Sequence, residues 1–149
     1  TQPSLTREGA AAAIDDLDDV ALPALRILLA EDNAVNQKVA LRILERIGYH
    51  ADVAANGFEV LKALEFKGYD VILMDLQMPV LDGLDAARQI RALPRGSTVP
   101  ILAMTASAFA EDRQRCLEAG MNGYVTKPVE MQRLRAALAE WLPADLSPR

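Results

Sequence analysis

The sequence has little of several features that would direct it towards particular functions. Its 149 residues contain one cysteine, Cys116, and one histidine, His50. A disulfide framework and a cysteine-based metal site are therefore excluded, and a reducing compartment is the simplest setting. No apolar run approaches the ~18 residues that a membrane-spanning helix needs. Because the acidic start is unlike a secretion signal, we expect a cytoplasmic chain, alone or as part of a membrane-bound protein, with no membrane contact of its own.

The chain also lacks an excess of positive charge and a nucleotide-binding loop. It has 21 Asp and Glu against 16 Lys and Arg, a net charge of −5. Nucleic acid and anionic membranes attract basic proteins, so we do not expect either as a primary partner. No Gly-x-Gly or Walker pattern for ATP occurs. The chain is therefore not expected to draw a phosphoryl group from ATP by itself.

What remains is an ordinary globular composition, with 51% hydrophobic and 25% charged residues. This length and composition suit one domain with its own core. Residues 1–24 differ from the rest, because they combine Pro, Ser and Thr with an alanine run and four aspartates between residues 15 and 19. We predict a linker over residues 1–24, a domain over 25–143 and a tail over 144–149.

Short apolar segments alternate with amphipathic ones along this domain. The clearest is Val71–Met74, a wholly apolar run that is typical of a strand covered on both faces. Further strands are predicted at 26–30, 50–54, 99–105 and 124–126, and helices at 33–47, 57–68, 84–92, 107–119 and 131–141. This alternation favours right-handed crossovers and a doubly wound α/β fold with a parallel sheet.

Two of the predicted helices have a clear apolar stripe. Gly48 is expected to end the first helix, and its inward stripe is predicted to comprise Asn36, Val39, Ala40, Ile43, Leu44 and Ile47. The corresponding stripe of the last helix comprises Met131, Leu134, Leu138 and Trp141. Both patterns indicate helices that pack on the sheet.

Polar side chains stand where the predicted strands end. The first strand ends at Glu31 and Asp32, the third at Asp75 and the fourth at Thr105, while Lys127 follows the fifth. In open α/β sheets these ends line one crevice. Any one of these residues alone is compatible with a solvated loop, but their recurrence at four strand ends indicates a site. Clustered carboxylates repel one another and need a cation, and Mg²⁺ prefers oxygen ligands.

Such a site suits phosphoryl transfer. A carboxylate beside Mg²⁺ can act as a nucleophile on phosphorus and form an aspartyl phosphate. The metal and the ammonium group of Lys127 would neutralise the phosphoryl oxygens, and the hydroxyl of Thr105 could donate a hydrogen bond to one of them.

Four motifs resemble those of the response-regulator receiver domain. They are LLAEDN at 28–33, VILMDLQMPVLDG at 71–83, MTA at 104–106 and YVTKP at 124–128. The likeness extends from about Arg26 to Trp141. It implies a flavodoxin-like five-stranded parallel sheet in the order 2-1-3-4-5, with five flanking helices.

The resemblance also implies the metal and phosphoryl ligands. Asp75 would accept the phosphoryl group, and Mg²⁺ would be held by Asp32, Asp75 and the backbone carbonyl of Gln77. Glu31 would act on the metal indirectly, either through a water molecule or through a contact with one of the direct ligands.

Further residues match the family's conformational switch. Thr105 and Tyr124 correspond to its switch pair, and Lys127 to its phosphate-binding lysine. A cis peptide bond before Pro128 is also implied.

The runs at 33–49 and 105–128 are most similar to receivers of hybrid sensor histidine kinases. The implied function is a phosphorelay module that takes a phosphoryl group from a histidine of a kinase domain or a phosphotransfer protein. It would catalyse its own phosphorylation and slow dephosphorylation, and residues 1–24 would be the tether from the kinase core. Two alternatives are a receiver-like interaction module that is not phosphorylated and an aspartate-nucleophile phosphohydrolase. The latter class has a second Asp two residues after the nucleophile, where this chain has Gln77.

A histidine partner must reach Asp75, so we expect it to dock over the first turn of the first helix. Val35 lies roughly 120° from the centre of the inward stripe, yet it is apolar. With Pro128 and Val129 across the crevice, it is a candidate anchor for a partner helix. A surface valine without a function is the alternative.

Overall fold

The computed structural model describes residues 25–78, 81–106 and 110–141. The predicted linker over 1–24 and the tail over 144–149 lie outside this part. The elements are β1 (Ile27–Ala30), α1 (Ala34–Ile47), β2 (Ala51–Ala54), α2 (Gly57–Phe66), β3 (Val71–Asp75), α3 (Gly83–Arg91), the 3₁₀ helix η2 (Pro94–Gly96), β4 (Ile101–Thr105), α4 (Ala110–Glu118), β5 (Gly123–Thr126) and α5 (Met131–Ala139). Among the described residues, no helix is long and apolar enough to cross a membrane.

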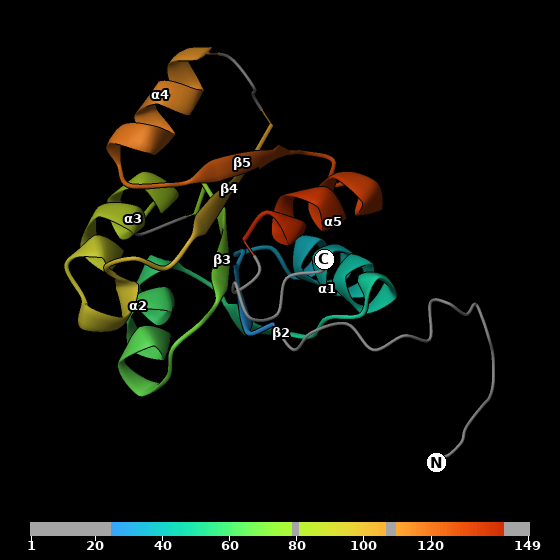
Figure 1. Ribbon diagram of the computed structural model, residues 1–149, viewed down its shortest axis with the longest axis horizontal. Coiled ribbons are helices and arrows are strands. Elements are labelled where there is room, and N and C mark those ends of the chain that lie inside the picture. Colours follow the sequence, from blue (N-terminus) through green and yellow to red (C-terminus); the bar gives the residue numbers. More distant parts are fainter. Residues whose placement is uncertain (1–24, 79–80, 107–109, 142–149) are drawn as a thin grey trace.

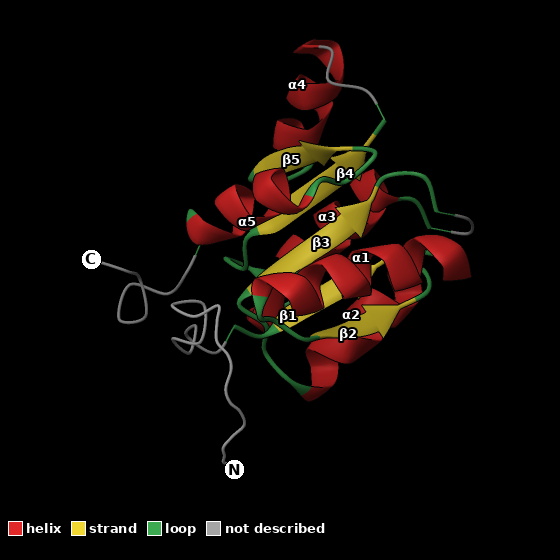
Figure 2. Cartoon of the chain, turned by 90° about the vertical axis from the view of Figure 1, so that its right-hand side faces the viewer, coloured by secondary structure: helices red, strands yellow, loops and turns green. Residues whose placement is uncertain are grey.

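The five strands form one parallel sheet in the order β2-β1-β3-β4-β5. Figure 1 shows α2, α3 and α4 on one side of this sheet and α1 and α5 on the other. Figure 2 gives the same layers from another direction, with α1 and α5 in front of the strands. The predicted doubly wound fold and its strand order are therefore confirmed.

The central strand β3 is buried along its whole length, and it contributes to two apolar cores. Successive strand side chains point to opposite faces. Ile72 and Met74 accordingly pack in the core beneath α2 and α3, whereas Leu73 packs in the core beneath α1 and α5. Anchoring on both faces fixes the position of Asp75 at the end of the strand.

The ends of α1 agree with the signals in the sequence. The Asn33 side chain accepts a hydrogen bond from the Asn36 N–H, which caps the first turn. At the other end, Gly48 has a φ of 115°, a left-handed conformation that suits glycine and stops the helix.

The apolar stripes predicted for the first and last helices were too long. Ala40, Leu44 and Ile47 are buried, but Asn36 is exposed and Val39 is 51% exposed. The reason is that a cavity, rather than packed sheet, lies between the first turn of α1 and the segment after β5. Met131, in the first turn of α5, is likewise 40% exposed.

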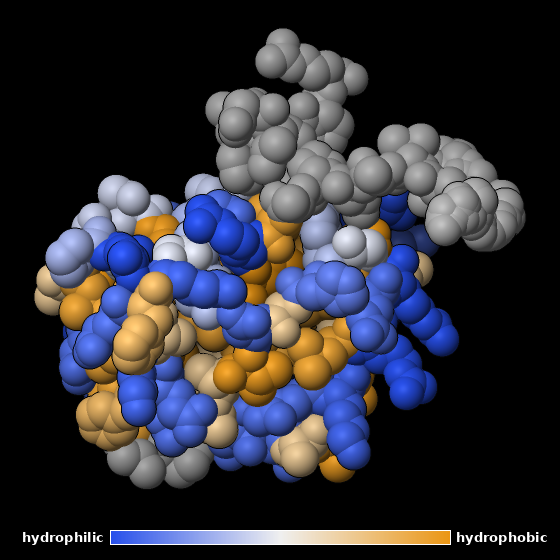
Figure 3. Space-filling model, turned by 90° about the horizontal axis from the view of Figure 1, so that it is seen from below, coloured by the Kyte–Doolittle hydropathy of each residue, from blue (hydrophilic) through white to orange (hydrophobic). Residues whose placement is uncertain are grey.

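The surface is mostly charged and polar. In the face drawn in Figure 3, hydrophilic side chains surround a central group of hydrophobic ones. This is the surface expected of an α/β domain whose sheet is covered by helices on both faces.

Candidate functional site

Three carboxylates meet at the carboxyl edge of the two central strands. Ala30 of β1 pairs with Met74 of β3, so Glu31 and Asp32 follow β1 at the level of Asp75. One carboxylate oxygen from each of the three residues lies within 4.8 Å of the others. Glu31 and Asp75 are 2% and 4% exposed, while Asp32 is exposed. The register of the sheet therefore assembles the acidic group that the strand ends predict.

Lys127 reaches this group from the segment that follows β5. Its Nζ lies 3.2 Å from Oδ1 of Asp75 and 3.3 Å from Oε1 of Glu31. Its backbone N–H donates a 2.7 Å hydrogen bond to the carbonyl of Thr105, which holds the segment against the end of β4. The peptide bond between Lys127 and Pro128 is cis, as the resemblance implies.

Burial raises the pKa of the Glu31 carboxyl, and the charge of Asp75 beside it acts in the same direction. The backbone N–H of Asn33, which donates to Oε2 at 3.2 Å, and the ammonium group of Lys127 oppose this rise. When ionised, the three carboxylates carry more charge than Lys127, which contacts two of them, Glu31 and Asp75. The donor atoms are all oxygens, so the cluster fits a hard divalent cation such as Mg²⁺.

A cavity of about 350 Å³ opens beside Asp75. Its lining includes the predicted Gln77, Thr105 and Lys127, and also the following residues that the sequence did not single out for the site: Asp82, Asp112 and Arg115. Asp82 is the N-cap of α3, Asp112 lies in the first turn of α4 and Arg115 in its last turn. The place of these helices beside the crevice depends on the tertiary fold. The cavity gives an incoming group access to the buried carboxylate.

The loop after β3 is held close to Asp75. The backbone N–H of Gln77 donates to Oδ1 of Asp75 at 3.1 Å. A Cβ on Gly83 would lie 2.7 Å from the carbonyl oxygen of Asp75, so only glycine lets α3 start so near the end of β3. The side chain of Gln37 makes a further contact that the sequence analysis missed, a 2.6 Å hydrogen bond to the carbonyl of Glu31.

The predicted switch pair lies on the neighbouring strands β4 and β5, of which β5 is the outer one. Thr105 of β4 pairs with Thr126 of β5, two residues after Tyr124. Because residues two apart share a face of a strand, the side chains of Thr105 and Tyr124 are diagonal neighbours. Both are half-buried, and the guanidinium group of Arg113 lies 5.2 Å from the centre of the Tyr124 ring.

A second cavity, of about 480 Å³, lies between the first turn of α1 and the segment after β5. Val39 and Ala40 line one side, and Pro128 and Val129 line the other. Val35 is 67% exposed on the same turn of α1. Of the apolar residues predicted to flank the crevice, Pro128 and Val129 line this cavity together with Val39, whereas Val35 is not part of its lining.

The chain was compared with known proteins. Residues 27–139 match the family model of the response regulator receiver domain. Hybrid signal transduction histidine kinase K of Dictyostelium discoideum is 42% identical over 121 residues, which cover 76% of this chain and 10% of that protein. The chain spans between 5% and 18% of the length of eight such curated relatives.

Solved structures give the same result. The receiver domain of sensor histidine kinase PA1611 from Pseudomonas aeruginosa PAO1, solved with a magnesium ion coordinated in its active site cleft, is 45% identical. It has a TM-score of 0.74, with 80% of this chain and 98% of that chain covered. The receiver domain of Ssk1, co-crystallised with the phosphotransfer protein Ypd1 of Saccharomyces cerevisiae, is 34% identical with a TM-score of 0.73, and the match covers 81% and 90% of the two chains.

Proposed function

The chain belongs to the response regulator receiver domain family, and from this we propose that Asp75 is the residue that accepts the phosphoryl group. The observation that carries the proposal is the meeting of Glu31, Asp32, Asp75 and Lys127 at one edge of the sheet. Of the three carboxylates, Asp75 alone ends the central strand and borders the open cavity. It shares the contact with Lys127 with Glu31.

The transfer reaction follows from these contacts. A carboxylate oxygen of Asp75 attacks the phosphorus of a phosphohistidine, the new P–O bond forms as the P–N bond breaks, and the imidazole departs with the electron pair. Lys127 and the amide of Gln77 both contact Oδ1, so we assign the attack to Oδ2. The ammonium group of Lys127 then neutralises charge on the transferred group.

The oxygen-only donor set supports Mg²⁺ as the metal. Asp32, Asp75 and the backbone carbonyl of Gln77 would hold the ion, with Glu31 behind them. When bound, Mg²⁺ supplies positive charge that stabilises the phosphoryl oxygens. The Mg²⁺-containing PA1611 receiver, at 45% identity, supports this part of the proposal.

We further propose that the partner is a phosphohistidine on a helical protein that docks across the second cavity. The exposed Val35 and Val39 on one side and Pro128 and Val129 on the other offer an apolar surface beside Asp75. The co-crystal structure of Ypd1 with the Ssk1 receiver shows that a receiver of this family binds a phosphotransfer protein.

The chain corresponds to a small part of its curated relatives, so its place in a larger protein is also a proposal. We infer that it is the receiver of a hybrid histidine kinase, with the domain over 25–143 following a tether over 1–24. A cytoplasmic location belongs to this inference, because the kinase that supplies the phosphoryl group uses cytoplasmic ATP.

Acetyl phosphate, a small phosphodonor, tests the reaction without a partner. With Mg²⁺, intact-mass spectrometry should show the gain of one phosphoryl group. Asp32→Asn should lower the affinity for Mg²⁺ at least tenfold, about 1.4 kcal/mol, and it should shift the phosphorylation curve to higher Mg²⁺. The circular dichroism spectrum should be unchanged. Equal Mg²⁺ dependence in the two proteins would contradict the assignment of Asp32.

The two alternative functions differ in measurable ways. An interaction module that is not phosphorylated would gain no mass under these conditions. A phosphohydrolase would turn over phosphomonoesters many times. That class carries a second Asp two residues after the nucleophile, where this chain has Gln77. Neither alternative has an observation in its favour.

A further inference from the structure

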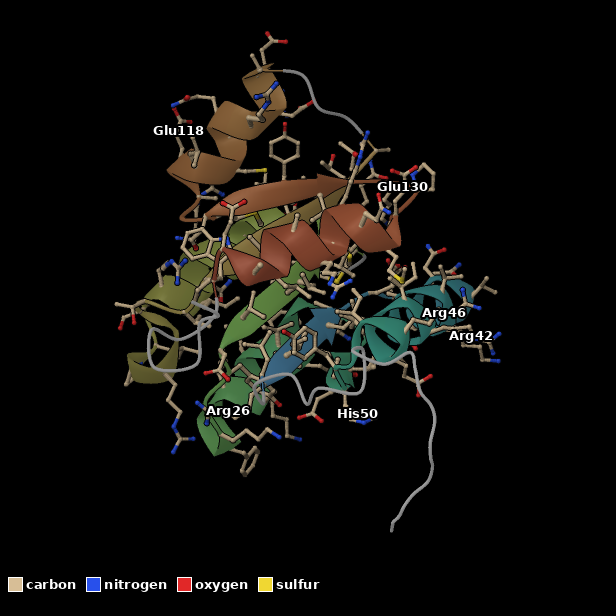
Figure 4. The ribbon with its side chains drawn as sticks, turned by 45° about the vertical axis from the view of Figure 1, so that its right-hand side comes forward. Arg26, Arg42, Arg46, His50, Glu118 and Glu130 are labelled. Carbon is tan, nitrogen blue, oxygen red and sulfur yellow. The ribbon has the colours of Figure 1, made fainter. Side chains whose placement is uncertain are left out.

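The outer side of α1 carries a line of exposed side chains that is half apolar and half basic. Val35, Val39, Arg42 and Arg46 follow one another at steps of four, three and four residues, so they lie along one side of the helix. The valines are 67% and 51% exposed, and both arginines are exposed. Figure 4 shows Arg42 and Arg46 close together, pointing away from the sheet. We call these four residues the α1 stripe.

The arginines of the α1 stripe lack a carboxylate partner. Among the described residues, no ion pair involves Arg42, Arg46 or the neighbouring Lys38. This holds although Glu45 follows Arg42 by three residues on the same helix. The apolar half is also exposed, so within the described part of the chain the α1 stripe has no ion-pair partner and little cover.

The complementary charge is concentrated in residues 1–24. This segment has five Asp and Glu and one Arg, so it carries four of the five net negative charges of the chain. Four of its acids lie between residues 15 and 19, on either side of Leu17, and Ile14 and Val20 flank them. A segment of apolar and acidic residues complements the α1 stripe in charge and in polarity, because the stripe is apolar and basic.

The segment enters the domain beside the basic half of the stripe. α1 ends at Ile47, and β2 begins four residues later at Ala51, which pairs with Ile27 at the start of β1. The six steps from Asp19 to Leu25 can extend roughly 20 Å. The α1 stripe is roughly 16 Å long at 1.5 Å per residue. The reach of the segment is thus longer than the stripe, whose basic end lies on the side where β1 begins.

We propose that residues 14–20 bind the α1 stripe of the same molecule, with their carboxylates against Arg42 and Arg46 and Ile14 towards Val39. Each exposed ion pair contributes little on its own. A short tether, however, gives an effective concentration on the order of millimolar, so weak attraction is enough to populate the bound state. This attraction is strongest at low ionic strength, because salt at 1 M reduces the screening length to about 3 Å.

Binding along the α1 stripe would compete with the docking of a histidine partner, a consequence that rests on the proposed function. Val35 and Val39 are the residues of α1 that we assign to partner docking. A segment bound along the stripe would cover them, and a histidine partner would have to displace it. Residues 14–20 would then act as an intramolecular competitor that is built into the tether.

The binding itself is tested on the unphosphorylated full chain without a partner, so its outcome is independent of the proposed function. A nitroxide is attached at Ala13→Cys in a Cys116→Ala background. In low salt, the amide signals of Val39, Arg42 and Arg46 should lose more than half of their intensity, while that of Lys62 on the opposite face is retained. If the amide signals of α1 had the same intensity with the oxidised nitroxide as with the reduced label, the proposal would be overturned.

Charge variants separate specific binding from simple proximity of the tether. Replacing Asp15, Asp16, Asp18 and Asp19 by Asn should reduce the relaxation of the α1 amides at least threefold, as should Arg42→Glu with Arg46→Glu. The control Lys62→Glu reverses the charge of an exposed residue of α2 and should leave the relaxation of the α1 amides unchanged. The same relaxation in the Asn variant as in the wild type would show that charge does not hold the segment, and the proposal would fail.

Discussion

At the scale of single residues, the site depends on one lysine shared by two buried carboxylates. Lys127 lies 3.2 Å from Asp75 and 3.3 Å from Glu31, and these two acids come from neighbouring strands. Buried charges persist only when they are paired or hydrogen-bonded. The lysine thus allows two acids to remain beneath an open cavity, where one of them can react.

A residue-scale prediction concerns a different ion pair, on the opposite edge of the sheet. Although burial pushes the pKa of the Asp70 carboxyl upward, hydrogen bonds from the side chain and backbone of Arg26, together with its charge, lower it overall. A lowered pKa in the folded state adds stability above the unfolded value, near 3.9, and this stability is lost as the pH falls through the folded value. Asp70→Asn should therefore reduce the free energy of unfolding by about 1 kcal/mol at pH 7.

Urea denaturation between pH 7 and pH 3 checks this prediction. The difference between wild type and Asp70→Asn should shrink as the pH falls below about 4. A difference that stays constant over this range would show that the charge of Asp70 does not contribute to stability.

At the scale of elements, the strands could be predicted from the sequence more completely than the helix faces. The run before Asp75 is apolar on both faces, which is a local signal, and the strand ends follow from it. The faces of α1 depend on what lies opposite, and a cavity beside its first turn leaves Val39 exposed. No periodicity within the helix contains that information.

Arg91 illustrates the same limit. Its guanidinium group donates hydrogen bonds to the carbonyls of Gly96, Val99 and Gly120. Burial lowers the pKa of this group, and the three carbonyls replace water around it. These partners lie up to 29 residues away in the chain, so the network that joins α3 to the start of β4 and to β5 was not predictable from local pattern.

The proposed docking of a partner on α1 leads to a prediction about transfer kinetics. Val35→Glu places a charge in the apolar surface next to the acidic cluster. It should slow phosphoryl transfer from a phosphorylated phosphotransfer protein at least tenfold, about 1.4 kcal/mol, while phosphorylation by acetyl phosphate stays intact. The matched control is Phe66→Glu on α2, where Phe66 is 73% exposed on the other face. Transfer rates unchanged by Val35→Glu would move the docking surface elsewhere.

The predicted switch also belongs to the scale of elements, because Thr105 and Tyr124 lie on the neighbouring strands β4 and β5. Phosphorylation adds about two negative charges with new acceptor oxygens, which should draw the hydroxyl of Thr105 inward. Tyr124 would fill the vacated space and leave its contact with Arg113 of α4. Moving a population from 1:99 to 99:1 takes about 5.5 kcal/mol, to which a charge-assisted hydrogen bond contributes.

Thr105→Ala should therefore accept a phosphoryl group and yet lose most of the chemical-shift change on α4, β5 and α5. The measurement is a pair of amide spectra with and without acetyl phosphate, with phosphorylation followed by mass. Shift changes on this face as large as those of the wild type would show that Thr105 does not couple the site to it.

At the scale of the whole molecule, a parallel sheet brings the ends of four strands, β1, β3, β4 and β5, to one site. The helices on both faces of the sheet hold these strand ends in place. At the other end of the sheet, Ile27 of β1 pairs with Ala51 of β2, four residues after the end of α1. The acidic site therefore lies at one end of α1, and the proposed tether would join the domain at the other end.

The central claim is that Asp75 carries the phosphoryl group, and locating the modified residue tests it most directly. Borohydride reduces an aspartyl phosphate to homoserine, so chains treated with acetyl phosphate and Mg²⁺ can be reduced, digested and sequenced by mass spectrometry. Homoserine is predicted at position 75 in the wild type and nowhere in Asp75→Asn. Homoserine at position 32, or undiminished phosphorylation of Asp75→Asn, would contradict the claim.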